Sequence, residues 1–134
     1  MTQTNTLIDE ARRAALRARC PYSSFRVGAA VHCSDGSVVC GCNVENASYG
    51  LSMCAERVAL FSAVAQGKRP TALAVSCIDA QNAATLGSRM PCGACLQVMH
   101  EPLPANGKVQ IDGVGARRIQ DLLPEGFQLT PDGL

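Results

Sequence analysis

Hydrophobic and polar positions follow a helical period at the start of the chain and a β period after it. In residues 5–19 apolar side chains recur at helical spacing, and Thr6 and Asp9 are spaced as a capping box, which predicts a first helix. Residues 26–33 and 37–42 form two β segments around a glycine-containing turn. The N-terminal third therefore predicts a helix followed by a β-hairpin.

The remaining pattern alternates helices with strands. Residues 54–65 are too apolar for a surface helix and predict a buried one, while the nearly all-apolar residues 71–78 predict a strand covered on both faces. A further helix is expected at 92–101, a strand at 108–112 and a last short helix at 118–123. This order indicates an α/β layered domain around a central sheet.

Composition narrows the class of protein. The 134 residues are expected to form a single domain, 1–134. Hydrophobic residues make up 47% and charged residues only 17%, against a usual charged share of about 25%, which favours an oligomer that buries extra apolar surface. The net charge of +1 argues against a nucleic-acid partner. No signal region or membrane-length apolar run is visible, so no membrane association and a cytoplasmic location are expected.

Eight cysteines need an explanation in such a chain. A disulfide scaffold belongs to shorter secreted chains that cannot build a hydrophobic core, and this chain can build one. Small buried side chains and metal ligands are therefore the better interpretation.

Three of these cysteines form the strongest chemical pattern. Cys92 and Cys95 form a Cys-x-x-Cys pair at a predicted helix start, and Cys54 begins another helix. Helix N-termini favour thiolates, and three ligands leave the fourth tetrahedral position open for catalysis. Glu56 follows Cys54 by two residues, which predicts a zinc-activated water with Glu56 as proton shuttle. Arg57 is expected to offset the excess negative charge of three thiolates.

The full pattern matches the three-cysteine variant of the zinc deaminase signature. Two other interpretations stay open. A structural zinc site would be closed by a fourth ligand, for which Cys77 and His100 are candidates. The Cys-x-x-Cys pair alone would also suit a thiol redox module.

Beyond the zinc motif, the chain resembles the small homotetrameric zinc-dependent cytidine deaminases. The matching segments, in the family's order and spacing, are 21–30 (PYSSFRVGAA), 41–50 (GCNVENASYG), 54–57 (CAER), 91–95 (PCGAC) and 122–127 (LLPEGF). The resemblance implies a three-layer α/β/α fold with a mixed sheet of about five strands and one Zn²⁺ per chain. It also implies hydrolytic deamination of cytidine or 2'-deoxycytidine to uridine or 2'-deoxyuridine plus ammonia, in pyrimidine salvage.

The resemblance further implies a set of substrate-binding residues, namely Phe25, Asn43, Glu45, Tyr49, Ala55 and Phe127. Asn43 and Glu45 would bind the ribose hydroxyls and Phe25 the base. The Ala55 backbone N–H would contact the base carbonyl and Glu56 the ring nitrogen. Tyr49 and Phe127 would reach a neighbouring subunit's site, so the homotetramer would complete each site. Taken singly, Phe25 could instead be a core residue, Asn43 a turn residue and Tyr49 a packing ring.

Two positions depart from the family pattern. Leu96 stands where the family usually has arginine, which leaves Arg57 as the main counter-charge, and Met90 stands where serine is frequent. Leu96 keeps open a modified cytosine nucleoside or another aminated heterocycle as substrate. A non-catalytic zinc-binding or redox module is a second alternative, and RNA or DNA editing is a third that the charge disfavours.

Overall fold

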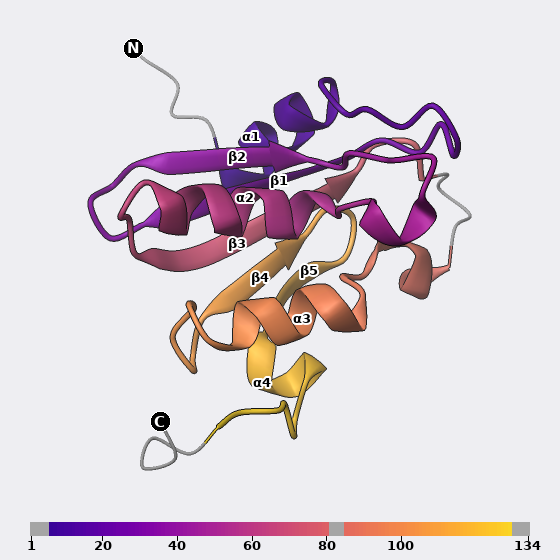
Figure 1. Cartoon of the computed structure of the whole chain (residues 1–134). Coiled ribbons are helices and arrows are strands. Elements are labelled where there is room, and N and C mark those ends of the chain that lie inside the picture. The colour runs from indigo at the N-terminus through magenta and orange to yellow at the C-terminus, as the bar shows by residue number, and fades with distance from the viewer. Residues whose placement is uncertain (1–5, 81–84, 130–134) are drawn as a thin grey trace.

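A computed structural model describes residues 6–80 and 85–129 (Figure 1). Its elements in chain order are α1 (Leu7–Ala15), β1 (Val27–Cys33), β2 (Val38–Cys42), α2 (Ala55–Ala65), β3 (Pro70–Cys77), α3 (Gly93–His100), β4 (Lys108–Ile111), β5 (Gly115–Arg118) and α4 (Ile119–Leu122). Short 3-10 turns occupy Tyr49–Leu51 and Leu86–Arg89. Within the described part of the chain, no helix has the length and apolar character needed to cross a membrane.

The five strands form one mixed sheet in the order β2-β1-β3-β4-β5. β1 lies antiparallel to both β2 and β3, β3 and β4 are parallel, and β5 returns antiparallel along β4. The parallel pair is joined through α3, as a parallel connection requires a crossover. The predicted mixed sheet of about five strands is confirmed.

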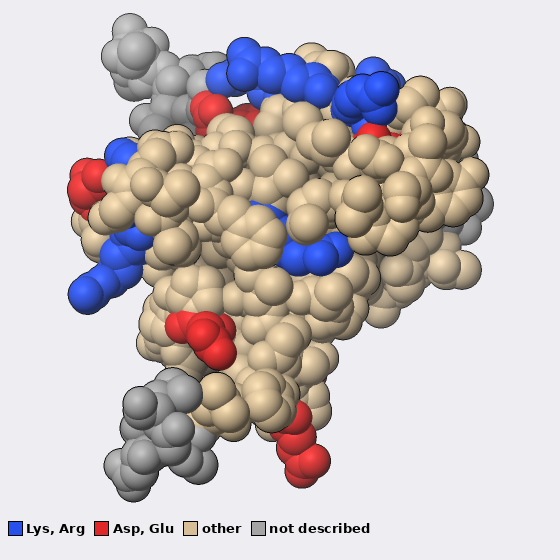
Figure 2. All heavy atoms as spheres, in the orientation of Figure 1, with Lys and Arg blue, Asp and Glu red and all other residues tan. Residues whose placement is uncertain are grey.

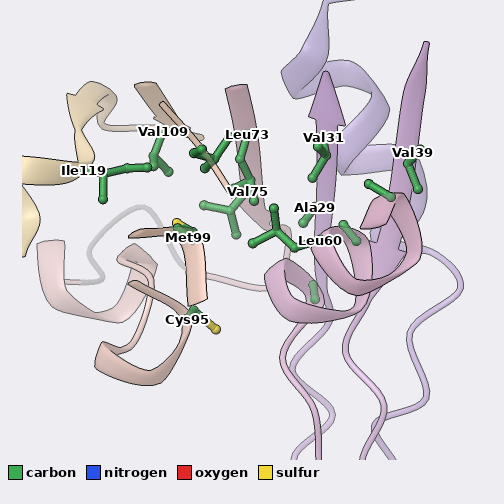
Figure 3. Close-up of a cluster of buried hydrophobic side chains, with 14 of the residues drawn as sticks. Ala29, Val31, Val39, Leu60, Leu73, Val75, Cys95, Met99, Val109 and Ile119 are labelled. Atoms are coloured by element: carbon green, nitrogen blue, oxygen red, sulfur yellow. The ribbon is translucent and has the colours of Figure 1, made fainter. Parts of the chain in front are cut away.

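Helices cover both faces of this sheet. α1 packs on one face through a small cluster of Ala11, Ala30 and Ala74. On the other face α2, α3 and α4 enclose the main core, where Leu60 and Met99 lie among Leu73, Val75 and Val109 (Figure 3). Alternate residues of β3 enter the two clusters, which explains its nearly continuous apolar sequence. The predicted three-layer α/β/α arrangement is confirmed.

Two glycines bring helices unusually close to the sheet. A Cβ on Gly28 would collide with the Ala11 carbonyl oxygen of α1, and one on Gly41 would lie 2.5 Å from the Ala59 nitrogen of α2. Only a residue without a side chain fits such an approach. Gly41 thereby fixes α2 against β2, just before the chain continues into Asn43.

Most predicted elements are present, with differences at their ends. The capping box of Thr6 and Asp9 is confirmed. The first helix ends at Ala15 rather than at residue 19, because Arg19 instead forms a parallel bridge with Val44. Residue 5, the expected start, lies outside the described residues.

Two further differences concern β5 and α2. The sequence pattern does not predict β5, since its four residues are all exposed and show no alternation of apolar and polar side chains. The buried helix predicted at 54–65 is buried on one face only: Phe61 and Val64 of α2 are 48% and 55% exposed in the single chain. This leaves an apolar helix face without a covering layer among the described residues.

Candidate active site

Two helix N-termini bring the three predicted cysteines together. Cys54 is the N-cap residue of α2, Cys92 is the N-cap residue of α3, and Cys95 lies one turn into α3. Their Sγ atoms all lie within 4.8 Å of one another. The backbone N–H of Cys95 donates to Cys92 Sγ over 3.5 Å, which holds the Cys-x-x-Cys pair around the helix start.

This cluster fits a tetrahedral zinc ion. With Zn–S bonds of about 2.3 Å, thiolates in a tetrahedron lie about 3.8 Å apart, so a small contraction suffices. No other group of three or more metal-binding side chains gathers among residues 6–80 and 85–129. Cys77 and His100, the candidate fourth ligands, do not belong to the cluster. The described residues thus supply three ligands and leave one coordination position for other molecules, as in catalytic zinc sites.

Arg57 supplies positive charge to the cysteines. Its Nη2 donates to Cys54 Sγ over 3.5 Å, and its Nε is buried with no hydrogen-bond partner in the described part of the chain. A hydrogen bond from Cys95, aided by Arg57, lowers the pKa of Cys54 to about 5. The same bond raises the pKa of Cys95, because its proton is held between the two sulfurs. Zinc would replace that proton and receive three thiolates.

Among residues 6–80 and 85–129, Glu56 is the one charged side chain that is buried, with 4% of its surface exposed. Burial raises its pKa to about 7, and the nearby Cys54 thiolate acts in the same direction. A carboxyl group with a pKa near neutrality can both accept and return a proton. As the second residue of α2 it is held rigidly beside the cysteine cluster.

A cavity of about 240 Å³ opens beside Glu56. Its walls hold four residues predicted to bind substrate: Phe25, Asn43, Glu45 and Ala55. Cys54 and Cys92 also line it. A larger groove of about 750 Å³ between α2 and α3 contains none of the cysteines and no Glu56, so we assign the chemistry to the smaller cavity.

Asn43 and Glu45 are held by hydrogen bonds to the segment that carries Phe25. Asn43 Oδ1 accepts the Val27 N–H over 2.9 Å, and its Nδ2 donates to the Phe25 carbonyl oxygen over 2.8 Å. Glu45 Oε1 accepts the N–H groups of Tyr22 and Ser23 over 3.0 and 3.1 Å. Hydrogen bonds from Ser23 and Tyr22, led by the Ser23 hydroxyl, lower the pKa of Glu45.

Tyr49 and Phe127 lie outside the cavity of their own chain. They are 74% and 67% exposed, and the rings of Tyr49 and Tyr22 meet edge to face at a centroid distance of 5.8 Å. The backbone of Phe127 is fixed by the Gln97 side chain, which donates to its carbonyl over 2.7 Å and accepts its N–H over 3.1 Å. The structure therefore does not bring these two rings to the site within one chain.

The residues that depart from the family pattern have distinct surroundings. Leu96 is 9% exposed and packs in the main core. Met90 packs against the same core and lines the cavity. Cys77, which the sequence offered as a candidate fourth zinc ligand, also lines the cavity. Its position at the end of a buried strand was the available signal, since ligands of α/β proteins often bind at strand ends.

Comparison with known proteins agrees with this geometry. The family model described as "Cytidine and deoxycytidylate deaminase zinc-binding region" matches residues 1–106. Cytidine deaminase from Halalkalibacterium halodurans is 44% identical over 125 residues, covering 90% of this chain and 91% of that protein. Cytidine deaminase from Mycobacterium tuberculosis is 44% identical over 126 residues, covering 93% and 90%.

Solved structures show the same fold. The crystal structure of cytidine deaminase from Burkholderia pseudomallei superposes with a TM-score of 0.78 at 45% identity, covering 90% of this chain and 96% of that one. The crystal structure of cytidine deaminase from Mycobacterium tuberculosis superposes with a TM-score of 0.77 at 42% identity, covering 92% of this chain and 95% of that one. The zinc-binding family model and the three-cysteine cluster together support one zinc ion per chain. The chain belongs to the cytidine and deoxycytidylate deaminase family of zinc-binding proteins.

Proposed function

We propose that this protein hydrolyses cytidine and 2'-deoxycytidine to uridine and 2'-deoxyuridine with release of ammonia, a reaction of pyrimidine salvage. One observation carries the proposal: the buried Glu56 lies beside three cysteines with an open coordination position, at the wall of a cavity. The relatives at 44% identity carry the name cytidine deaminase.

The metal would be held by Cys54, Cys92 and Cys95. When bound, zinc supplies Lewis acidity that makes water nucleophilic near neutral pH. Arg57 offsets part of the negative charge of the three thiolates through its contact with Cys54.

Glu56 would move the protons of the reaction. Attack at C4 of cytosine requires that the nucleophile lose a proton, that the ring nitrogen gain one, and that the amino group leave as ammonia. A single carboxyl group with a pKa near 7 suits all three transfers, because it is readily protonated and deprotonated. Its place in the first turn of α2 fixes it at the cavity wall, where it would face one end of the base.

Four other residues would bind the nucleoside. Phe25 is half-buried at the cavity wall, outside the core cluster, and offers a ring to the base. Ala55 is the first residue of α2, so its N–H lacks an intrahelical acceptor and can donate to the base carbonyl. Asn43 and Glu45 would bind the ribose hydroxyls.

We further propose a homotetramer in which neighbouring subunits complete each site. Tyr49 and Phe127 are largely exposed and do not line the cavity of their own chain, which supports a role in a neighbouring site. The apolar groove between α2 and α3, with Phe61 and Val64 at its rim, gives a second copy a surface to cover. Figure 2 shows that charged side chains are sparse over most of this face.

Loss of cytidine absorbance on mixing with the zinc-loaded protein tests the proposal. Wild type is expected to convert cytidine and Glu56→Ala to be inactive while retaining zinc. Glu125→Ala, an exposed glutamate, is the matched control. Zinc binding without conversion of either nucleoside would overturn the proposal. Conversion of only modified cytosine nucleosides would favour the alternative substrate, whereas equal behaviour of wild type and Glu56→Ala would favour a binding module.

A further inference from the structure

The Ser23 hydroxyl lies between the two parts of the proposed nucleoside site. It donates to Glu45 Oε2, and it accepts the backbone N–H of Phe25 over 3.1 Å. One hydroxyl group thus joins the carboxylate proposed for the ribose to the residue proposed for the base. The local sequence does not predict this contact, because Ser23 and Glu45 are 22 positions apart.

The turn that carries Ser23 has an unfavourable backbone. Ser24 has a φ of 55°, in the left-handed region that residues other than glycine rarely adopt. Its N–H donates to the Cys20 carbonyl oxygen over 2.9 Å, and the next N–H, of Phe25, donates to the Ser23 hydroxyl. Such a conformation persists only when surrounding contacts hold it, and Glu45 provides three of them.

Counting acceptor positions shows what Glu45 has left for a ligand. An ionised carboxylate offers about four, two on each oxygen. The N–H groups of Tyr22 and Ser23 fill those of Oε1, and the Ser23 hydroxyl fills one on Oε2. One acceptor position remains, on Oε2, and its direction is fixed by the three donors.

Asn43 is constrained in the same way. Its Oδ1 and Nδ2 each make one hydrogen bond to the backbone around Phe25, which leaves one acceptor and one donor position. Asn43 and Glu45 therefore offer a ligand only a few hydrogen-bonding positions, and the directions of these positions are fixed. Such an arrangement suits the hydroxyls of a ribose.

We propose that Ser23 is a positioning residue: its hydroxyl aims the remaining acceptor of Glu45 at a ribose hydroxyl of the nucleoside. The inference rests on the proposed function and deepens it. Ser23 would set the preference for substrates that keep their ribose hydroxyls over sugar-deoxygenated analogues. It touches neither the base nor the reacting atoms, so it acts through Glu45.

Steady-state kinetics on two substrates separates this role from a merely structural one. Cytidine carries both the 2'- and the 3'-hydroxyl, and 2',3'-dideoxycytidine lacks these two. Ser23→Ala is expected to lower kcat/KM for cytidine about tenfold, mainly through KM, because one hydrogen bond to a charged group is lost. The same variant should change kcat/KM for dideoxycytidine less than about twofold, since Glu45 has no hydroxyl to meet there. Ser23→Thr, which keeps the hydroxyl, should restore discrimination.

Ser34→Ala, an exposed serine in the β1–β2 turn, is the matched control and should leave both substrates unaffected. In a Glu45→Gln background, adding Ser23→Ala should lower kcat/KM for cytidine little further, since the two residues act as one unit. Equal losses on both substrates, or no loss on cytidine, would overturn the role of Ser23 alone. Failure of the wild type to convert either nucleoside would instead overturn the proposed function, and this inference with it.

Discussion

Arg57 and Cys54 are joined one helical turn apart on α2, with Nη2 3.5 Å from Sγ. Three thiolates around one divalent ion would leave an excess negative charge. Leu96 packs in the core and carries no charge, whereas Arg57 contacts Cys54 directly. We therefore propose that the guanidinium supports the zinc site without binding the metal.

Replacing Arg57 should weaken the hold on zinc. Arg57→Gln removes the counter-charge, and residues that support metal ligands typically contribute ten- to a hundredfold in affinity, so a loss of about tenfold is expected. Competition with a chromophoric chelator measures it. Arg117→Gln is the control, because the Arg117 guanidinium donates to the Ala116 carbonyl oxygen of β5 rather than to a cysteine. Unchanged zinc affinity in Arg57→Gln would show that the thiolate charge is balanced elsewhere.

Asp112 should make stability depend on pH. Its carboxylate accepts two 2.7 Å hydrogen bonds from Arg12 and one from Ser76, and chiefly the Arg12 bond lowers its pKa. A lowered folded pKa stabilises the protein above the unfolded pKa of about 3.9, and that stabilisation is lost as pH falls through the folded value. Asp112→Asn should therefore lower the free energy of unfolding by about 1 kcal/mol at pH 7 and by less near pH 3.

Urea unfolding of wild type and variant at both pH values measures this difference. Asp121→Asn breaks an exposed pair with Arg118 on the surface, where ion pairs contribute little, and serves as the control. A gap between wild type and Asp112→Asn that stays constant or widens on acidification would contradict the prediction.

Gly41→Ala should disturb both stability and the metal site. The added methyl group would lie 2.5 Å from the Ala59 nitrogen and 2.8 Å from the Ala55 carbonyl oxygen, so α2 must move away from β2. Overpacking of this kind costs about 1–3 kcal/mol, and here both neighbours are backbone. Thermal melting and zinc content measure the two effects. Gly87→Ala, with no atom near its added methyl group, should match wild type in both. A Gly41→Ala protein with wild-type melting and zinc content would refute the close approach of α2 to Gly41.

The sequence was most informative where reactive residues stand at the start of a predicted helix. Cys54 and Glu56 share one helix start, so their spacing alone predicted a metal ligand beside a proton shuttle. The contact of Ser23 with Glu45 depends on a turn with left-handed Ser24 and could not be predicted from local pattern. β5 also lacked a signal, because an exposed edge strand needs no apolar alternation. Tertiary pairing, rather than propensity, decided these parts.

Phe61→Asp should dissociate the proposed tetramer. The Phe61 side chain is 48% exposed at the rim of the α2–α3 groove, and a carboxylate there would have to be buried between subunits. Sedimentation velocity is expected to show smaller species. Activity per chain should fall more than about tenfold, if one or two aromatic contacts to the substrate come from the neighbour.

The matched control is Leu16→Asp, which places the same charge on a 65% exposed apolar residue just after α1, away from the groove. It should leave both assembly and activity unchanged. A Phe61→Asp protein that dissociates but keeps full activity would show that Tyr49 and Phe127 do not serve a neighbouring site, even though the subunits associate. A variant that stays assembled would place the interface on another face, and the groove would then need a different occupant.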